Sequence, residues 1–176
     1  YNSDTRVYFF DKVYGGSLFN KNEITNTFLN HYDGHKRIGF DMLNHINFHQ
    51  KNLGSGQGWH RDSPYSNQYK VIVYLSDVDS NNGPFQYVEN SHKPSHINKL
   101  EKKCGLSPGN LRYSENHIKT CLEGEIKEVL GLKGTAILVN TKLLHRGKPI
   151  SKDCERYAIT RYSAASKLSS EFLKYS

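Results

Sequence analysis

The sequence predicts an all-β core of the double-stranded β-helix type, which is a jelly-roll or cupin-like barrel, with a few flanking helices. Three observations predict it. Several short strand-like segments are separated by turn sequences, strands and helices do not alternate regularly, and one long irregular insertion covers residues 93–122. Short strands at turn-bounded intervals are typical of antiparallel barrels and jelly rolls, whereas a doubly wound fold needs regular alternation.

The first half of the chain supplies four of the predicted elements. Residues 6–11, "RVYFFD", read as a short strand, and residues 22–32 have apolar side chains at helical spacing. Residues 36–49 read as one or two strands that end at a glycine-rich loop. Residues 69–78, "YKVIVYLSDV", form a nearly continuous apolar run, which is typical of a buried strand.

The second half begins with a turn at residues 80–84, "SNNGP", because Asn-Gly tolerates positive φ and proline cannot continue a central strand. The strand "FQYV" follows directly, and the insertion at 93–122 contains helical pieces around "LSPGN". We expect the insertion to contribute to substrate specificity, since pocket covers are often inserted between barrel strands. Three further strands are predicted at 125–130, 134–140 and 156–163.

Length and charge bound the class of protein. The 176 residues suit a single domain over 1–176, and the first residue, Tyr1, is compatible with a chain truncated at its N-terminus. The formal charge is +7, but the lysines are scattered among acidic residues. Without a compact basic block we do not expect nucleic-acid binding, whereas an anionic small-molecule substrate would suit this surface.

No apolar run approaches the about 18 residues of a membrane span, so we expect no membrane association.

Cysteine usage suggests the compartment. Cys104, Cys121 and Cys154 are odd in number and lack C-x-x-C spacing. We interpret them as free thiols in a reducing compartment, and therefore expect a cytoplasmic protein. The oligomeric state is left open.

The stretch "GWHRDS", residues 58–63, carries the first candidate site. On a strand, residues two apart point to the same face, so His60 and Asp62 could address one point in space. A metal needs at least a third ligand, and the best candidate is His145, which follows a buried run and precedes Gly147 and Pro149. Two imidazoles and one carboxylate form the facial triad of non-haem Fe(II) sites, with open positions for other ligands.

An arginine could complete such a site by binding a carboxylate in a bidentate manner. Arg156 and Arg161 lie in the same predicted strand, five residues apart, so they point to opposite faces. Only one of them can point into the barrel, and the residues alone do not decide which.

Four stretches together resemble the phytanoyl-CoA dioxygenase superfamily of Fe(II)- and 2-oxoglutarate-dependent oxygenases. They are "INFHQKNLGSGQGWHRDSPY", "VYLSDVDSNNGPFQYVENSHK", "LLHRGKP" and "ERYAITRY". The resemblance implies that His60, Asp62 and His145 bind iron and that Arg156, eleven residues after the last ligand, binds the distal carboxylate of 2-oxoglutarate. The first stretch is also similar to ectoine hydroxylases, which implies Asn47 as a hydrogen-bond partner of 2-oxoglutarate.

The implied activity is that of a dioxygenase that uses Fe(II), 2-oxoglutarate and O2 to hydroxylate a C–H bond of a small molecule, with release of succinate and CO2. Related halogenases lack the carboxylate ligand, so the presence of Asp62 favours hydroxylation. One departure concerns Gly147, which stands where the superfamily often has a hydroxyl residue, two positions after the last histidine. The alternatives are a cupin-like divalent-metal hydrolase or isomerase with the same ligands, and a non-catalytic binding module.

Overall fold

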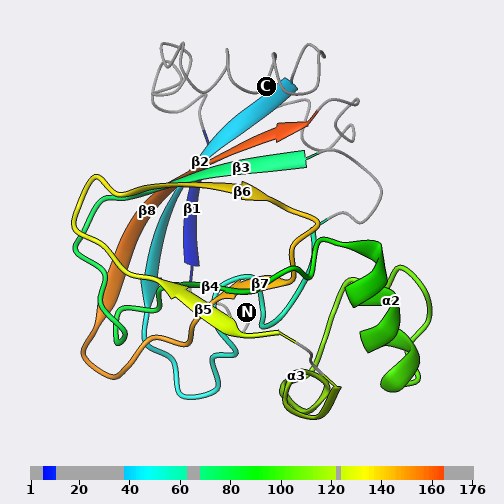
Figure 1. Ribbon diagram of the computed structural model, residues 1–176. Coiled ribbons are helices and arrows are strands. Elements are labelled where there is room, and N and C mark those ends of the chain that lie inside the picture. Colours follow the sequence, from blue (N-terminus) through cyan, green and yellow to red (C-terminus); the bar gives the residue numbers. More distant parts are fainter. Residues whose placement is uncertain (1–5, 11–37, 63–67, 122–123, 165–176) are drawn as a thin grey trace.

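The computed structural model describes residues 6–10, 38–62, 68–121 and 124–164. Two antiparallel sheets face each other in it, one of five strands and one of three (Figure 1). The predicted all-β core of the jelly-roll type is therefore confirmed, with the described strands arranged as two separate sheets. The helix predicted at residues 22–32 lies outside the described residues.

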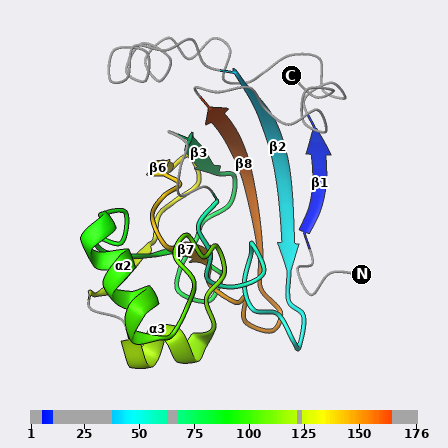
Figure 2. The same cartoon turned by 90° about the vertical axis from the view of Figure 1, so that its right-hand side faces the viewer.

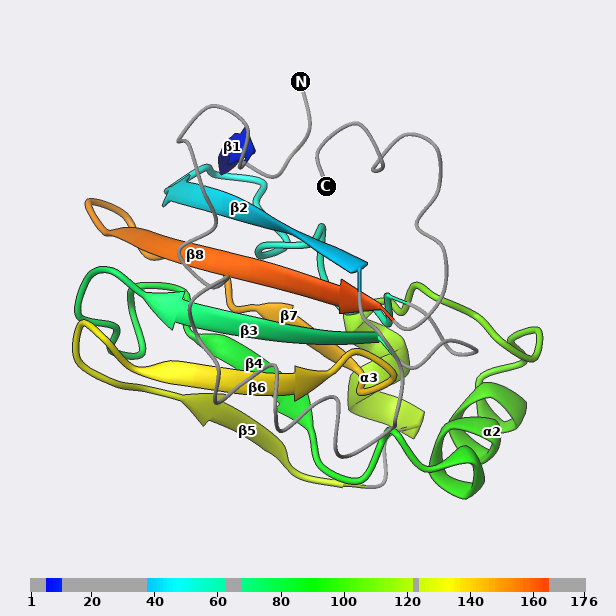
Figure 3. The same ribbon diagram turned by 90° about the horizontal axis from the view of Figure 1, so that it is seen from above.

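The larger sheet has the order β1-β2-β8-β3-β6, and its strands lie side by side above the smaller sheet (Figure 3). Each strand matches a predicted segment, and residues 36–49 contain one strand rather than two. The five are β1 (Arg6–Phe10), β2 (Ile38–Asn47), β3 (Gln68–Tyr74), β6 (Ala136–Asn140) and β8 (Glu155–Ala164).

The smaller sheet has the order β5-β4-β7. Its strands are β4 (Phe85–Val88), β5 (Ile126–Val129) and β7 (His145–Gly147). The sequence placed His145 just after a buried run, and in the structure it opens a short strand of its own, β7, and pairs with Tyr87 of β4. A strand of three residues is too short to show a two-residue periodicity, so β7 itself was not predicted.

The insertion at 93–122 forms two helices, α2 (Pro94–Lys103) and α3 (Glu115–Cys121), which lie on the side of the molecule away from β1 (Figure 2). Proline is favourable in the first turn of α2, where its missing N–H would have no helical partner. Both helices bury apolar residues against the segments that carry the histidines. The buried cluster contains Trp59, Val88, Ile97, Leu100, Tyr113, Ile118 and Leu144.

The register of β2, β8 and β3 decides which side chains face the smaller sheet. Lys70 pairs with Tyr162, Ile72 with Thr160, and Tyr74 with Ala158. Because directly opposed residues point to the same face, alternate residues of the three strands form one continuous inner surface. It consists of Met42, Asn44, Ile46, Lys70, Ile72, Tyr74, Arg156, Ala158, Thr160 and Tyr162.

The cysteines differ from the sequence interpretation. Cys104, the C-cap of α2, is disulfide-bonded, whereas Cys154 is a free thiol. The expectation of three free thiols is therefore wrong for Cys104, because an odd number of cysteines still allows one pair. The prediction of a cytoplasmic location was based on three free thiols, so it is no longer supported by the cysteines and stays a prediction.

Candidate metal centre

Three candidate ligands meet where the glycine-rich loop passes β7. His60 and His145 exchange two backbone hydrogen bonds, each of 2.9 Å. Single donor atoms of His60, Asp62 and His145 all lie within 4.8 Å of one another. His60 forms two isolated bridges, to Arg112 and His145, and Asp62 lies in a bend, so His60 and Asp62 do not share a regular strand as expected. Their side chains nevertheless converge, because the bridge to β7 fixes the backbone of His60.

Backbone carbonyls fix the orientation of both imidazoles. The Nδ1 atom of His60 lies 2.8 Å from the carbonyl oxygen of Gly58, and that of His145 lies 2.6 Å from the carbonyl oxygen of Leu143. A carbonyl only accepts hydrogen bonds, so each Nδ1 carries the proton and donates it. Each Nε2 lone pair is thereby directed toward Asp62, as in histidines that bind metals.

The charge states of the ligands also suit a divalent cation. Burial and the neighbouring Lys70 ammonium hold the pKa of His145 well below its usual value, so this imidazole is neutral at pH 7. Burial acts to raise the pKa of the Asp62 carboxyl, but Lys70 and the two histidines together outweigh it and hold this pKa well below its usual range. Two imidazoles and one carboxylate are a donor set that fits a first-row divalent metal.

Glycines in the loop before His60 allow this close packing. A Cβ at Gly56 would lie 2.1 Å from Cε1 of His60, and one at Gly54 would lie 1.9 Å from the carbonyl oxygen of Gly147. Both glycines also have positive φ, at +87° and +97°. Any other residue at these positions would move the loop or the histidine.

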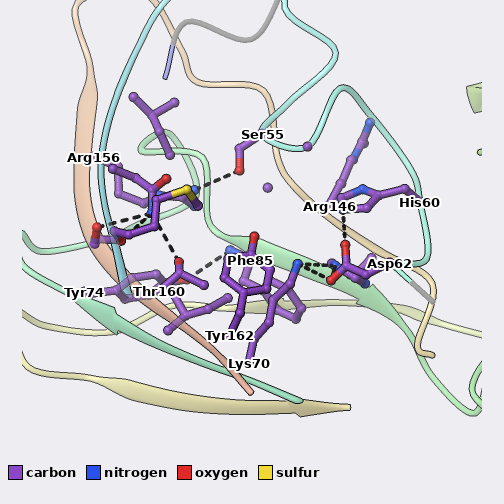
Figure 4. Close-up of a pocket in the computed structure, with 18 of the residues that line it drawn as sticks. Ser55, His60, Asp62, Lys70, Tyr74, Phe85, Arg146, Arg156, Thr160 and Tyr162 are labelled. Atoms are coloured by element: carbon purple, nitrogen blue, oxygen red, sulfur yellow. Dashed lines mark hydrogen bonds and ion pairs between the residues drawn. The ribbon is translucent and has the colours of Figure 1, made fainter. Parts of the chain in front are cut away.

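A cavity of about 170 Å³ extends from the three ligands across the inner face of the larger sheet (Figure 4). Arg156 lies at its other end and is only 5% exposed. Its guanidinium donates to the carbonyl of Gly83 and approaches the hydroxyl of Ser55 at 3.4 Å, with the ring of Tyr74 at 5.9 Å. The cavity therefore has the candidate ligands at one end and a buried guanidinium at the other.

The two candidate arginines point to opposite faces, as strand parity predicts. Arg161 forms an ion pair with Asp41 at 3.2 Å and does not line the cavity, whereas Arg156 does.

Asn47, which the resemblance implies as a partner of 2-oxoglutarate, lies at one end of the larger sheet. It ends β2, is exposed, and does not line the cavity. The asparagine that does line it is Asn44, which is buried and donates to Oγ1 of Thr160 at 3.2 Å. The two asparagines are three residues apart and so face opposite sides of the sheet. The role of Asn47 in co-substrate binding stays a prediction, and Asn44 is a second candidate for it.

Ser55 is a cavity residue that the sequence reasoning missed. A Cβ at Gly147 would lie 2.7 Å from both Cβ and Oγ of Ser55 and 3.1 Å from a terminal nitrogen of Arg156. The Ser55 hydroxyl therefore occupies the space that a side chain at 147 would take. A hydroxyl from the glycine-rich loop therefore lies beside Arg156, at the place where Gly147 has no side chain.

Residues of the insertion differ in their positions relative to the cavity. Arg112 lines the cavity, whereas Asn110 donates to the Arg112 carbonyl and Tyr113 is buried in the core around α2 and α3. Trp59, which precedes the first candidate ligand, is 1% exposed and packs in the same core.

The fold is a jelly roll, and His60, Asp62 and His145 lie together at one end of its cavity. These features define a jelly-roll protein with a candidate metal site. The chain belongs to the phytanoyl-CoA dioxygenase family, whose model matches residues 17–158. No curated protein matches the chain in sequence. None of the helices in the described part of the chain is long and apolar enough to cross a membrane.

Solved structures of similar fold include three that hold relevant ligands. The chain is 15% identical to HygX from Streptomyces hygroscopicus with iron bound, with a TM-score of 0.60 over 92% of this chain and 72% of that one. The chain is 13% identical to the epimerase SnoN in complex with Fe3+, alpha ketoglutarate and nogalamycin RO, with a TM-score of 0.61 over 90% of this chain and 63% of that one. It is 15% identical to EctD from S. alaskensis with 2-oxoglutarate and 5-hydroxyectoine, with a TM-score of 0.59 over 90% of this chain and 56% of that one.

At these identities the likeness shows a shared fold. The chain spans part of the length of such structures, from 31% of EvdMO1 to 72% of HygX.

Proposed function

We propose that the protein is an Fe(II)- and 2-oxoglutarate-dependent dioxygenase that hydroxylates a C–H bond of a small-molecule substrate and releases succinate and CO2. The observation that carries the proposal is the arrangement of the cavity, with the ligand atoms of His60, Asp62 and His145 within 4.8 Å of one another at one end and Arg156 at the other. Iron and 2-oxoglutarate in structures of similar fold support it.

In this proposal His60, Asp62 and His145 hold the metal. The bound metal would supply the activation of O2, with 2-oxoglutarate as the electron donor. The backbone carbonyls of Gly58 and Leu143 keep both Nε2 atoms available for the metal. Asp62 occupies a position that a halide would need, and this favours hydroxylation over halogenation.

Arg156 would bind the distal carboxylate of 2-oxoglutarate. Its guanidinium is buried and is already held by Gly83 and Ser55, so little side-chain entropy is lost when a carboxylate binds. The low-dielectric walls formed by Tyr74, Ala158 and Ile46 strengthen such a charge pair by excluding water.

The test compares Arg156→Gln with Arg161→Gln, which removes the same charge from the opposite face of β8. We expect Arg156→Gln to weaken 2-oxoglutarate binding by about 10- to 100-fold, the usual value of a charge-assisted hydrogen bond, with metal binding retained. Arg161→Gln should bind 2-oxoglutarate as the wild type does. Isothermal titration of the metal-loaded proteins measures both.

Equal 2-oxoglutarate affinity in the two variants would contradict the proposal. A cupin-like hydrolase or isomerase, or a binding module, uses the same ligands without needing Arg156, and this result would favour them.

A further inference from the structure

Lys70 extends from the inner face of β3 to the candidate metal ligands. Its ammonium forms an ion pair of 2.5 Å with Oδ2 of Asp62 and lies 3.2 Å from Nε2 of His145. The side chain is only 7% exposed, and Figure 4 shows Lys70 and Asp62 directed toward each other at the end of the cavity remote from Arg156. A lysine this deeply buried is rare without a charged partner, and Asp62 is such a partner.

The two oxygens of the Asp62 carboxylate have different surroundings. Oδ2 faces the Lys70 ammonium, whereas Oδ1 lies 3.3 Å from Nε2 of His60. Because Nδ1 of His60 donates its proton to the carbonyl of Gly58, Nε2 presents a lone pair. Oδ1 and this Nε2 are therefore two acceptors that face each other, and such a pair is favourable only when a cation lies beside both. Oδ2 already has a cation beside it in Lys70.

Only one of these two contacts of Lys70 is compatible with a bound metal. The imidazole nitrogen of His145 has a single lone pair, so a metal and Lys70 cannot both use it. A carboxylate has two oxygens, so Asp62 can give Oδ1 to a metal while Oδ2 stays paired with Lys70. The contact that persists is therefore the ion pair with Asp62.

This ion pair would decide how many coordination positions Asp62 takes. A carboxylate can bind a metal through one oxygen or through two. With Oδ2 held by the ammonium, Asp62 binds through Oδ1 alone, and this leaves one more position open than binding through both oxygens would. A site of two histidines and one carboxylate needs its open positions for co-substrates.

We propose that Lys70 is a positioning residue that keeps Asp62 a one-oxygen ligand, and so keeps open the positions that 2-oxoglutarate and O2 require. The inference rests on the metal-binding part of the proposed function and deepens it. Lys70 acts through Asp62, so its role is visible in the metal-loaded protein before any co-substrate is added.

The test counts the water molecules on bound Mn(II), without 2-oxoglutarate, from the relaxation rate of the solvent protons. We expect about three exchangeable waters in the wild type and about two in Lys70→Met, because a buried Oδ2 without its ammonium turns to the metal. Lys70→Met should also bind Mn(II) about tenfold more tightly, because a competing and repelling charge is lost and a second oxygen binds. Lys70→Arg keeps a cation beside Asp62 and should restore the wild-type water count.

Lys133→Met is the matched control, because it makes the same substitution at an exposed position outside the cavity. It should leave the water count and the Mn(II) affinity at their wild-type values.

A second measurement needs no change at Lys70, and so decides the matter even where Lys70→Met does not fold. It is the infrared difference spectrum between metal-loaded and metal-free wild type. The separation of the two carboxylate stretching bands of Asp62 should be wide, as for binding through one oxygen, rather than narrow, as for binding through two. Bands that are lost in Asp62→Asn belong to this carboxylate.

Three results would overturn the inference: an equal water count in wild type and Lys70→Met, weaker Mn(II) binding in Lys70→Met, which a purely structural role predicts, or a narrow band separation in the wild type. An unchanged water count together with a loss of 2-oxoglutarate affinity in Lys70→Met would assign Lys70 to the co-substrate instead. A wild type that binds no Mn(II) contradicts the proposed function itself, and so is distinguishable.

Discussion

At the scale of single residues, the shape of the cavity near Arg156 depends on the side chains at positions 55 and 147. Gly147 has no side chain, and Ser55 fills the space that one would occupy. The hydroxyl of Ser55 lies 3.4 Å from the guanidinium of Arg156. We infer that Ser55 replaces the hydroxyl residue that the superfamily often places after the last ligand.

A swap of the two residues tests this. Gly147→Ser alone should weaken 2-oxoglutarate binding and destabilise the fold, because its Cβ would lie 2.7 Å from Ser55. The double variant Ser55→Gly, Gly147→Ser removes the collision and returns a hydroxyl to the same space, so it should recover most of the affinity. Isothermal titration with 2-oxoglutarate and thermal unfolding measure the two effects. A double variant that is worse than Gly147→Ser would show that the hydroxyls do not substitute for each other.

Much of the residue-scale site could be predicted, but not all of it. His60, Asp62 and His145 stand in short motifs that mark them as candidate ligands, and the resemblance to the superfamily selected Arg156 over Arg161. Ser55, Asn44 and Lys70 could not be found in that way, because their positions in the cavity depend on strand register and on contacts between segments far apart in sequence.

At the scale of elements, α2 and α3 support the ligands from outside the cavity. Arg61 lies between two candidate ligands, is buried, and donates to the carbonyl of Lys142 at 2.8 Å. Its guanidinium is 4.0 Å from Glu101 of α2, which also accepts a hydrogen bond of 2.9 Å from the hydroxyl of Tyr113. The insertion thus anchors the ligand segment through a buried charged network, beyond the contribution of Arg112 to the cavity.

Removal of the Glu101 carboxylate should lower both the free energy of unfolding and the affinity for metal. We expect Glu101→Ala to lower the free energy of unfolding by about 3 kcal/mol, because it leaves Arg61 buried without a carboxylate and removes one of the two acceptors near the Tyr113 hydroxyl. Glu101→Gln keeps an acceptor for Tyr113 and should lose less. Metal binding should weaken in parallel with stability, since Arg61 fixes the backbone between His60 and Asp62. Urea unfolding and Mn(II) titration are the measurements.

Glu125→Ala serves as the control, because the Glu125 side chain is exposed and forms a surface ion pair with Lys127. It should not alter unfolding or metal binding. If Glu101→Ala behaved in the same way, the buried network would not support the site.

The elements themselves were largely predictable, because turn residues and apolar runs mark the strand ends. The three-residue strand β7 was not, since pairing with β4, and not its own pattern, defines it. The insertion was recognised as partly helical, but its sequence gave no sign that α2 would supply a buried carboxylate to Arg61.

At the scale of the whole molecule, the two facing sheets create one cavity with two chemically different ends. The larger sheet supplies Arg156 and Lys70 from its inner face, and β7 with the glycine-rich loop supplies the histidines. The strand order that achieves this could be expected for a jelly roll, whereas the charge balance of the cavity became visible only in three dimensions. We propose that this cavity holds Fe(II) and 2-oxoglutarate together.

The most direct test is an anaerobic titration of the metal-free protein with Fe(II) and then 2-oxoglutarate, followed by visible absorption. We expect a charge-transfer band that saturates near one equivalent of each, and we expect Asp62→Ala, which lacks one ligand, to bind iron weakly and give no such band. A protein that binds iron or zinc but never gives the band with 2-oxoglutarate would contradict the account. The same triad would then serve another chemistry.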